Sequence, residues 1–232
     1  MKIVTWNCNG AFRKKFQKIA SLEADIYIIQ ECENTESART DYQKWAMNFF
    51  WHGKNKHKGI GIFVNPSVIV EPLNWPDQDL QYFLPVRINN QFNLIAVWTK
   101  EANSPTFKYI GQLWKYLQIH KDNMKTNTVI CGDFNSNKRW DVWDRWWNHS
   151  DVIRELHDIG MVSLYHEARG QDQGAESSPT YYQHRKIEKA YHIDYAFSSK
   201  GMFNAQRNSV EVGVHGEWLE FSDHMPVTFT ID

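Results

Sequence analysis

Short runs of hydrophobic residues recur along the chain, and each run ends in polar residues. The runs are rich in Ile, Val and aromatic residues, which favours β-strands. We expect strands at 2–7, 25–31, 59–64, 93–99, 128–133, 193–198 and 226–231. Polar side chains follow the apolar part of several runs, so the ends of these strands are candidates for a functional site.

Other segments repeat their hydrophobic residues with the period of a helix. One stripe consists of Phe12, Phe16, Ile19 and Ala20, and a second consists of Phe107, Ile110, Trp114 and Leu117. We also expect short helices at 140–149 and 152–159, the latter stopped by Gly160. Strands interspersed with helices predict a layered α/β fold. No linker or repeat divides the chain, so we expect a single domain, 1–232.

The composition is that of a globular protein. Of 232 residues, 42% are hydrophobic and 15% aromatic, including 11 Trp, which disfavours a disordered or fibrous chain. No stretch approaches the roughly 18 apolar residues of a membrane span. The first residues, MKIVTWNCNG, are typical of a strand rather than of a signal peptide. We therefore expect a soluble, cytoplasmic protein with no membrane span.

The three cysteines, Cys8, Cys32 and Cys131, are sparse and odd in number. This pattern disfavours a disulfide framework and fits a reducing compartment. A zinc–thiolate site is an alternative, but the sequence has no C-x-x-C pair and Cys8 alternates away from Asn7. We expect the three thiols to pack as small hydrophobic groups.

The charges nearly balance, with 26 Lys and Arg against 27 Asp and Glu. Bulk attraction of a polyanion is therefore disfavoured. The charges are segregated, however, because residues 1–22 hold five basic residues and no acid, whereas 23–41 hold six acids and one Arg. A local basic site is compatible with this pattern.

Polar residues follow the first two expected strands. Asn7 and Asn9 share a face if the first strand continues, and two amides can hold a phosphate or a water. Glu31 ends an apolar strand, where a charge is costly unless it is paired or bound to a cation such as Mg²⁺. The alternatives are a turn before Gly10 and a solvated Glu31.

Three further motifs combine acids, an amide and an imidazole. After Gly132, Asp133 and Asn135 can align a water and accept its proton, although an Asx turn is an equally simple interpretation. The motifs H-I-D-Y and S-D-H contribute Asp194 and His224, and a carboxylate can fix the tautomer of an imidazole. Each motif alone is also compatible with a structural role.

The ordered motifs N-x-N, Q-E, G-D-F-N, I-D-Y and S-D-H together resemble the endonuclease/exonuclease/phosphatase superfamily, from about residue 3 to 227. That superfamily includes apurinic endonucleases, pancreatic deoxyribonuclease, inositol polyphosphate 5-phosphatases, neutral sphingomyelinases and tyrosyl-DNA phosphodiesterases. The resemblance implies a four-layer α/β/β/α sandwich of two packed mixed sheets flanked by helices. The site would lie at the strand-end rim.

The resemblance also implies a metal site. Glu31 would be the principal ligand of Mg²⁺, for which Mn²⁺ is a possible substitute, and Asp223 and Asn9 would lie around the ion. Many relatives have an acid where this chain has the neutral Asn9, so we expect one ion rather than two. Trp98 replaces a Tyr or His of many relatives and cannot accept a hydrogen bond, so it is left outside the catalytic set.

The implied chemistry is in-line hydrolysis of a phosphate ester. Asp133 would align and deprotonate the attacking water, with Asn135 beside it. His224 would hydrogen-bond the scissile phosphate and be oriented by Asp194. Asn7 would bind phosphate or help to order the surroundings of the metal.

Substrate contacts carry less sequence information. The candidates are His192, Tyr181, His184, Arg185 and Trp140, from basic or aromatic segments near the motifs. Helical spacing places Trp140, Trp143 and Trp147 on one face, which is more typical of core packing.

Our leading hypothesis is a Mg²⁺-dependent nuclease, an endo- or exonuclease acting on DNA or RNA, with a monomer as the default state. The alternatives are a phosphatase or phosphodiesterase for a small phosphorylated metabolite, a lipid headgroup or a protein–nucleic acid phosphodiester. A catalytically silent binding module is disfavoured, because the full set of site residues is present.

Overall fold

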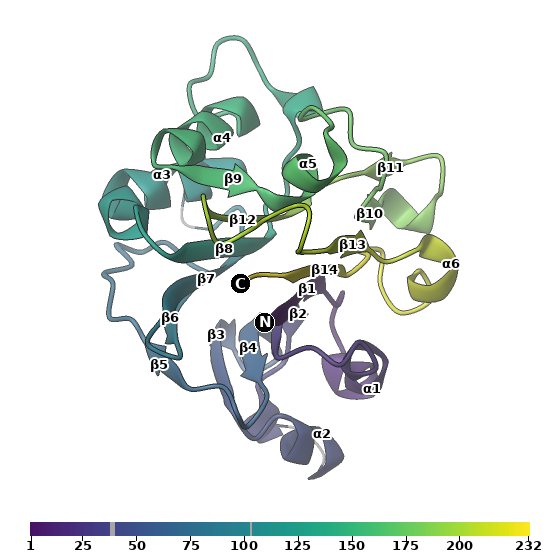
Figure 1. Ribbon diagram of the computed structural model, residues 1–232. Coiled ribbons are helices and arrows are strands. Elements are labelled where there is room, and N and C mark those ends of the chain that lie inside the picture. The colour runs from purple at the N-terminus through teal and green to yellow at the C-terminus, as the bar shows by residue number, and fades with distance from the viewer. Residues whose placement is uncertain (38–39, 103) are drawn as a thin grey trace.

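The computed structural model describes residues 1–37, 40–102 and 104–232. Two six-stranded mixed sheets pack face to face, and helices cover their outer faces (Figure 1). In spatial order the first sheet contains β13 (Val210–Val212), β14 (Val227–Thr230), β1 (Lys2–Asn7), β2 (Ile26–Cys32), β4 (Lys58–Val64) and β3 (Phe49–Asn55). The second contains β5 (Val70–Pro72), β6 (Phe83–Ile88), β7 (Phe92–Trp98), β8 (Thr128–Asp133), β12 (Asp194–Ser199) and β9 (Met161–Ser163). The expected α/β/β/α sandwich is confirmed.

Helices and short hairpins complete the four layers. The α-helices are α1 (Phe16–Ala20), α2 (Thr40–Trp45), α3 (Ile110–His120), α4 (His149–Asp158), α5 (Leu164–Arg169) and α6 (His215–Trp218). The 3₁₀ helices are η1 (Phe12–Lys14), η2 (Thr35–Ser37), η3 (Lys121–Met124), η4 (Lys138–Trp140) and η5 (Gln183–Arg185). Strands β10 (Tyr181–Tyr182) and β11 (Ala190–Tyr191) form a separate hairpin. Among the described residues, no helix is both long enough and apolar enough to cross a membrane.

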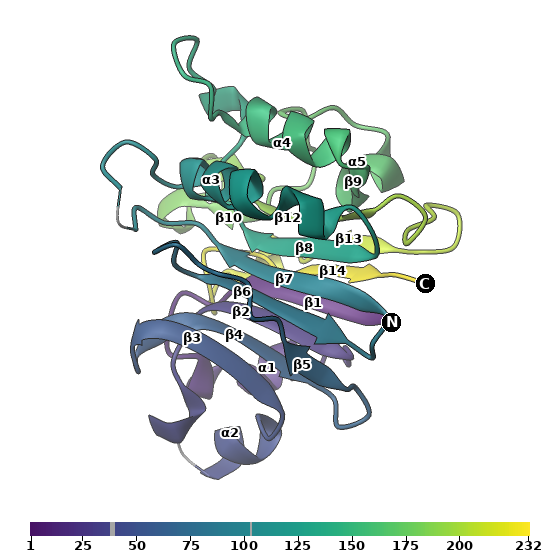
Figure 2. The ribbon, with the colours of Figure 1, turned by 90° about the vertical axis from the view of Figure 1, so that its left-hand side faces the viewer.

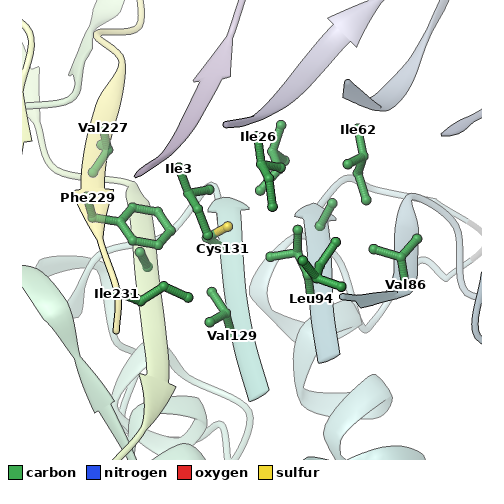
Figure 3. Close-up of a cluster of buried hydrophobic side chains, with 14 of the residues drawn as sticks. Ile3, Ile26, Ile62, Val86, Leu94, Val129, Cys131, Val227, Phe229 and Ile231 are labelled. Atoms are coloured by element: carbon green, nitrogen blue, oxygen red, sulfur yellow. The ribbon is translucent and has the colours of Figure 1, made fainter. Parts of the chain in front are cut away.

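The main core lies between the two sheets, where side chains of both inner faces meet (Figure 3). Strand alternation sends Ile3 of β1 and Val129 and Cys131 of β8 into this layer. The opposite faces carry two other cores: α3 and α4 cover the second sheet, and α1, α2 and α6 cover the first. All three cysteines are free and buried in these cores, as expected.

The seven expected strands are present with bounds within one residue of those expected. The unexpected strands are β3, β5, β9 and β13 at the sheet edges, β6 beside an edge, and the β10–β11 hairpin. Edge strands contact solvent and therefore lack a long apolar run. The sequence pattern identifies the buried centre of each sheet and misses its borders.

The prediction of a helix at 140–149 is wrong. Between η4 and α4 the chain makes turns, because the side chain of Asn148 takes the bonds that a helix would need. Its Oδ1 accepts from the backbone N–H of Val142 (2.9 Å), and its Nδ2 donates to the carbonyls of Val142 (3.0 Å) and Arg145 (2.6 Å). Trp143 is consequently 96% exposed, contrary to the expected core position.

Gly132 is required for the close approach of β7 and β8. Its φ is +147°, and a Cβ at this position would lie 1.8 Å from the carbonyl oxygen of Val97. These strands pair in parallel, with Val97 opposite Gly132 and Trp98 opposite Asp133. The glycine therefore fixes the strand end that carries Asp133.

We expect Gly132→Ala to reduce the free energy of unfolding by about 4 kcal/mol or more, from backbone strain together with the steric overlap. The matched control is Gly160→Ala, where φ is +80° but no heavy atom lies within 4 Å of the added Cβ. That control should lose only about 1–2 kcal/mol. Urea unfolding of both variants measures the difference, and equal losses would contradict the close-approach explanation.

Candidate active site

Polar side chains replace apolar ones where the inner faces of the two sheets reach one end of the sandwich. Asn7 continues the inward-facing series of β1, and Asp133 continues that of β8. The chain termini lie at the opposite end of the sandwich, where β1 begins (Figure 2). In the antiparallel β8–β12 pair, Asp194 lies directly opposite Asp133. The fold thus brings motifs from both ends of the sequence to one rim.

Asp133 is fully buried and is held by amides. Its Oδ2 accepts hydrogen bonds from Asn7 Nδ2 (2.9 Å) and Asn135 Nδ2 (2.9 Å), and its Oδ1 accepts from the backbone N–H of Asn135 (2.8 Å). Asn135 adopts a φ of +46°, which asparagine tolerates better than most residues. The Asx turn is present, and it places the side chain of Asn135 against the Asp133 carboxylate, so the turn does not exclude a functional role.

His224 and Asp194 form a buried pair. Nδ1 of His224 lies 2.9 Å from Oδ2 of Asp194, and the two side chains are 6% and 0% exposed. The Thr180 hydroxyl accepts a hydrogen bond from the backbone N–H of Asp194 (3.0 Å). The carbonyl of His224 accepts a hydrogen bond from the indole N–H of Trp6 (2.9 Å). The Ser222 hydroxyl accepts one from the backbone N–H of His224 (3.0 Å). Both members of the pair are thus fixed through their backbones.

The charges of the three buried groups are coupled. Burial alone would lower the pKa of His224, but the negative charges of Asp194 and Asp133 outweigh burial and raise this pKa to about 10. Burial raises the pKa of Asp133 to about 7, against the opposing effect of His224. The imidazole is therefore held in its charged form between two carboxyl groups, where it can donate from its free nitrogen to an anion.

A β-bulge sets the direction of Glu31. The register of β2 against β4 shifts between Gln30 and Cys32, and Glu31 lies at the shift with a φ of +63°. Regular alternation would send Glu31 to the same face as Ile29, which packs under the helices. Its Oε2 lies 2.6 Å from Nζ of Lys58, and its side chain is 18% exposed.

A second acidic group lies beside the first strand. Asp223 Oδ1 accepts a hydrogen bond from Asn9 Nδ2 (2.8 Å). Lys15 donates to the carbonyl of Cys8 (2.6 Å). Burial lowers the pKa of Lys15, the charge of Arg185 lowers it further, and the charge of Asp223 raises it. Arg185 and Asp223 therefore both lie within electrostatic range of Lys15.

Tyr181 marks the point where the acidic groups converge. Its ring centroid lies 4.7 Å from that of His224. Burial raises the pKa of Tyr181, and the charges of Asp223, Asp133 and Glu31 raise it further. The three carboxylates therefore lie within electrostatic range of the same phenol, although they come from separate strands and loops.

The other expected substrate contacts differ in position. His192 is 3% exposed, and its ring packs against Tyr165 (4.5 Å between centroids) and Tyr195 (5.0 Å), so its side chain is not available at the surface. Burial lowers its pKa to about 4. His184 and Arg185 are exposed on η5. Trp140 is 40% exposed.

Two groups of residues have the donors for a divalent cation. Asp133, Asp194 and His224 form the only described cluster of at least three such residues with ligand atoms within 4.8 Å of one another. This cluster is buried, however, and a charged His224 imidazole has no lone pair to offer an ion. Glu31, Asp223 and Asn9 offer only oxygen ligands at the more exposed rim. Hard oxygen ligands suit Mg²⁺, so the donor atoms of Glu31, Asp223 and Asn9 fit this ion better, with Glu31 paired to Lys58 and Asp223 to Asn9.

The sequence motifs missed several residues of the site. The hydroxyls of Thr180 and Ser222 accept hydrogen bonds from the backbone N–H groups of Asp194 and His224. Such hydroxyls have no distinctive sequence pattern. Lys58 lies in a basic segment, but its contact with Glu31 depends on the unexpected β3–β4 hairpin. Tyr191, whose ring lies 5.0 Å from that of Trp140, belongs to the unexpected strand β11.

Solved structures of similar fold include nucleases. A 3′-5′ exonuclease (NExo) from Neisseria meningitidis is 22% identical with a TM-score of 0.73, and each chain is covered over 100%. NExo from Neisseria, described as a 3′ phosphatase bound to product DNA hairpin, is 23% identical with a TM-score of 0.73, over 100% of this chain and 99% of that one. An AP endonuclease from Archaeoglobus fulgidus is 19% identical with a TM-score of 0.75, over 100% and 99%. At these identities the similarity establishes the fold.

A search of proteins of curated function finds no match. A family model described as the Endonuclease/Exonuclease/phosphatase family matches residues 4–224, which include all five motifs. With this match over nearly the whole sequence, the chain belongs to the Endonuclease/Exonuclease/phosphatase family.

Proposed function

We propose that the protein is a Mg²⁺-dependent phosphodiesterase that hydrolyses nucleic acid. The observation that carries this proposal is the buried cluster of Asp133, Asp194 and His224, with amides on one side and the Glu31 carboxylate nearby. Such a cluster can align a water on one side of a phosphate and stabilise negative charge on that phosphate. Membership of the family and the nucleases among the structures of similar fold support the same chemistry.

Each residue of the cluster has a distinct proposed role. Asp133 aligns the attacking water and accepts its proton, while Asn7 and Asn135 hold the carboxylate in position through three hydrogen bonds. His224, kept charged by Asp194, donates to an oxygen of the scissile phosphate. Because the site is buried, these interactions are stronger than they would be in water.

A divalent ion held by Glu31, with Asp223 and Asn9 around it, would neutralise phosphate charge and stabilise the leaving oxygen. The chain's own residues prepare this position. Lys58 balances the charge of Glu31 at 2.6 Å, and Asn9 orients Asp223 at 2.8 Å.

The cations around the carboxylates favour a polymer of phosphates as substrate. Lys15 lies within electrostatic range of both Asp223 and Arg185. Lys58 and Lys100 lie within 5.8 and 4.6 Å of the Trp98 ring, on the side of β7. Positive charges on both flanks can contact phosphates before and after the scissile one. NExo from Neisseria, with a similar fold, has been solved with a product DNA hairpin.

Asp133→Asn and His224→Ala should each lower kcat/KM for cleavage of labelled DNA and RNA oligonucleotides at least about 100-fold, because each removes a proton acceptor or donor at the phosphate. The matched control is Asp122→Asn, since the Asp122 side chain is 81% exposed. Circular dichroism and thermal unfolding establish that each variant is folded. Folded variants with unchanged cleavage would contradict the assignment, as would a wild-type protein that hydrolyses small phosphate esters but no oligonucleotide.

Glu31→Gln should weaken Mn²⁺ binding, measured by electron paramagnetic resonance, at least about tenfold, because an amide is a weaker ligand for a hard cation. The magnesium concentration for half-maximal cleavage should rise in parallel, and a chelator should abolish cleavage by the wild-type protein. Asp122→Asn again serves as the control. Unchanged Mn²⁺ affinity in Glu31→Gln would contradict the assignment of Glu31 as the principal ligand.

A further inference from the structure

A row of aromatic rings leads from His224 to the protein surface. The ring of Tyr181 lies 4.7 Å from that of His224, and the ring of Tyr191 lies 5.0 Å from that of Trp140. Tyr181 and Tyr191 are directly opposite in the antiparallel β10–β11 pair, so their side chains share a face. We call these four residues the aromatic row.

Trp140, at the outer end of the aromatic row, is followed in the sequence by two more exposed tryptophans. Trp140 is 40% exposed, Trp143 is 96% exposed and Trp146 is 63% exposed. The segment that presents these rings is tied down by the side-chain bonds of Asn148 and by a 2.9 Å bond from Arg145 Nε to Asn148 Oδ1. Large exposed apolar groups on an ordered segment are typical of a binding surface.

Exposed cations lie in the segments that carry the aromatic row. Lys138 and Arg139 immediately precede Trp140 on η4. Three more cations lie in the loop between β10 and β11, whose strands carry Tyr181 and Tyr191: Arg185, Lys186 and Lys189. All five cations are exposed, and the loop contains one acid, Glu188. Planar rings interleaved with cations match a chain of bases joined by phosphates.

We propose that the aromatic row and Trp143 form a stacking platform for unpaired bases of a nucleic-acid strand whose scissile phosphate lies at His224. This inference rests on the proposed nuclease function and specifies its substrate. Bases in a duplex are already stacked on their neighbours, so the platform selects a strand that is single-stranded beside the cleaved bond. A lipid surface is the other possible partner of exposed tryptophans, but it would contact only the outer rings, whereas the row continues inward to buried His224.

Binding to three 12-residue probes in EDTA tests the platform without cleavage. The probes are oligothymidylate, the same strand with abasic tetrahydrofuran residues in place of all nucleosides, and a blunt DNA duplex. Wild-type protein should bind oligothymidylate about tenfold or more tightly than the abasic strand, with quenching of tryptophan fluorescence. Trp140→Leu should weaken oligothymidylate binding about 5- to 100-fold, whereas Trp140→Phe, which keeps a stacking ring, should weaken it less than threefold.

Neither substitution at Trp140 should alter binding of the abasic strand. Met47→Ala, which removes a side chain that is 70% exposed near the end of α2, is the control for a general surface effect and should match the wild type. Equal wild-type affinity for the base-containing and abasic strands would overturn the platform. So would equal behaviour of Trp140→Leu and Trp140→Phe, equal affinity for the duplex, or a fluorescence response to phosphatidylcholine–phosphatidylserine vesicles without one to oligothymidylate.

Cleavage of oligothymidylate in Mg²⁺ separates this inference from the proposed function. If wild-type protein cleaves oligothymidylate but Trp140→Leu and Trp140→Phe bind it equally, only the platform is wrong. If oligothymidylate binds with the expected dependence on Trp140 but no nucleic acid is cleaved, the proposed nuclease function is wrong and the platform remains. Failure to bind any oligonucleotide in EDTA, together with no cleavage of any oligonucleotide in Mg²⁺, would contradict both.

Discussion

The site depends on the buried contact between His224 and Asp194, placed beside Asp133. Two carboxyl groups lie opposite each other in neighbouring strands with no exposed surface, an arrangement that is unfavourable without a compensating cation. The imidazolium of His224 supplies that charge. Its position requires β14 and the loop before it to meet β1, where the Trp6 indole and the Ser222 hydroxyl hold the backbone of this loop. The first and last motifs of the sequence therefore assemble together.

Neutral amides provide most of the remaining polar contacts near this pair. Asn7, Asn9 and Asn135 each orient a carboxylate, and they do so without adding charge to a site that already holds several acids. Lysines stand outside this group, with Lys58 at Glu31 and Lys15 near Asp223. The result is a small acidic centre with cations around it. The proposed function requires local attraction of a phosphodiester, and this distribution is compatible with it despite the nearly zero net charge.

Much of the fold could be predicted because the central strands are long, apolar and buried. The borders could not, because β3 and β13 contact solvent on one side and carry mixed residues. The Trp140–His149 segment was predicted as a helix from its spacing, but the side chain of Asn148 satisfies the backbone in turns instead. Side-chain hydrogen bonds of this kind can prevent a helix, and they cannot be recognised from the hydrophobic periodicity of the sequence.

The candidate site was predicted as a set of strand-end residues, and the structure brings together those of the five motifs. Spacing alone does not distinguish His192 from His224, since each lies within two residues of an Asp. The family resemblance assigned the catalytic role to His224, and His192 was expected as a substrate contact. The structure separates them: aromatic packing buries His192, whereas His224 lies beside Asp133 and Tyr181. The bulge at Glu31 could not be predicted from the sequence either, because a positive φ at a glutamate follows from strand pairing rather than from residue type.

The stereochemical course at phosphorus is the most direct test of in-line attack by water at this site. An oligonucleotide with one phosphorothioate bond of known configuration is hydrolysed in ¹⁸O-labelled water, and the configuration of the product is determined. We expect inversion, because the water attacks in line and no covalent intermediate forms. Retention of configuration would require a covalent enzyme intermediate and would contradict direct attack by water.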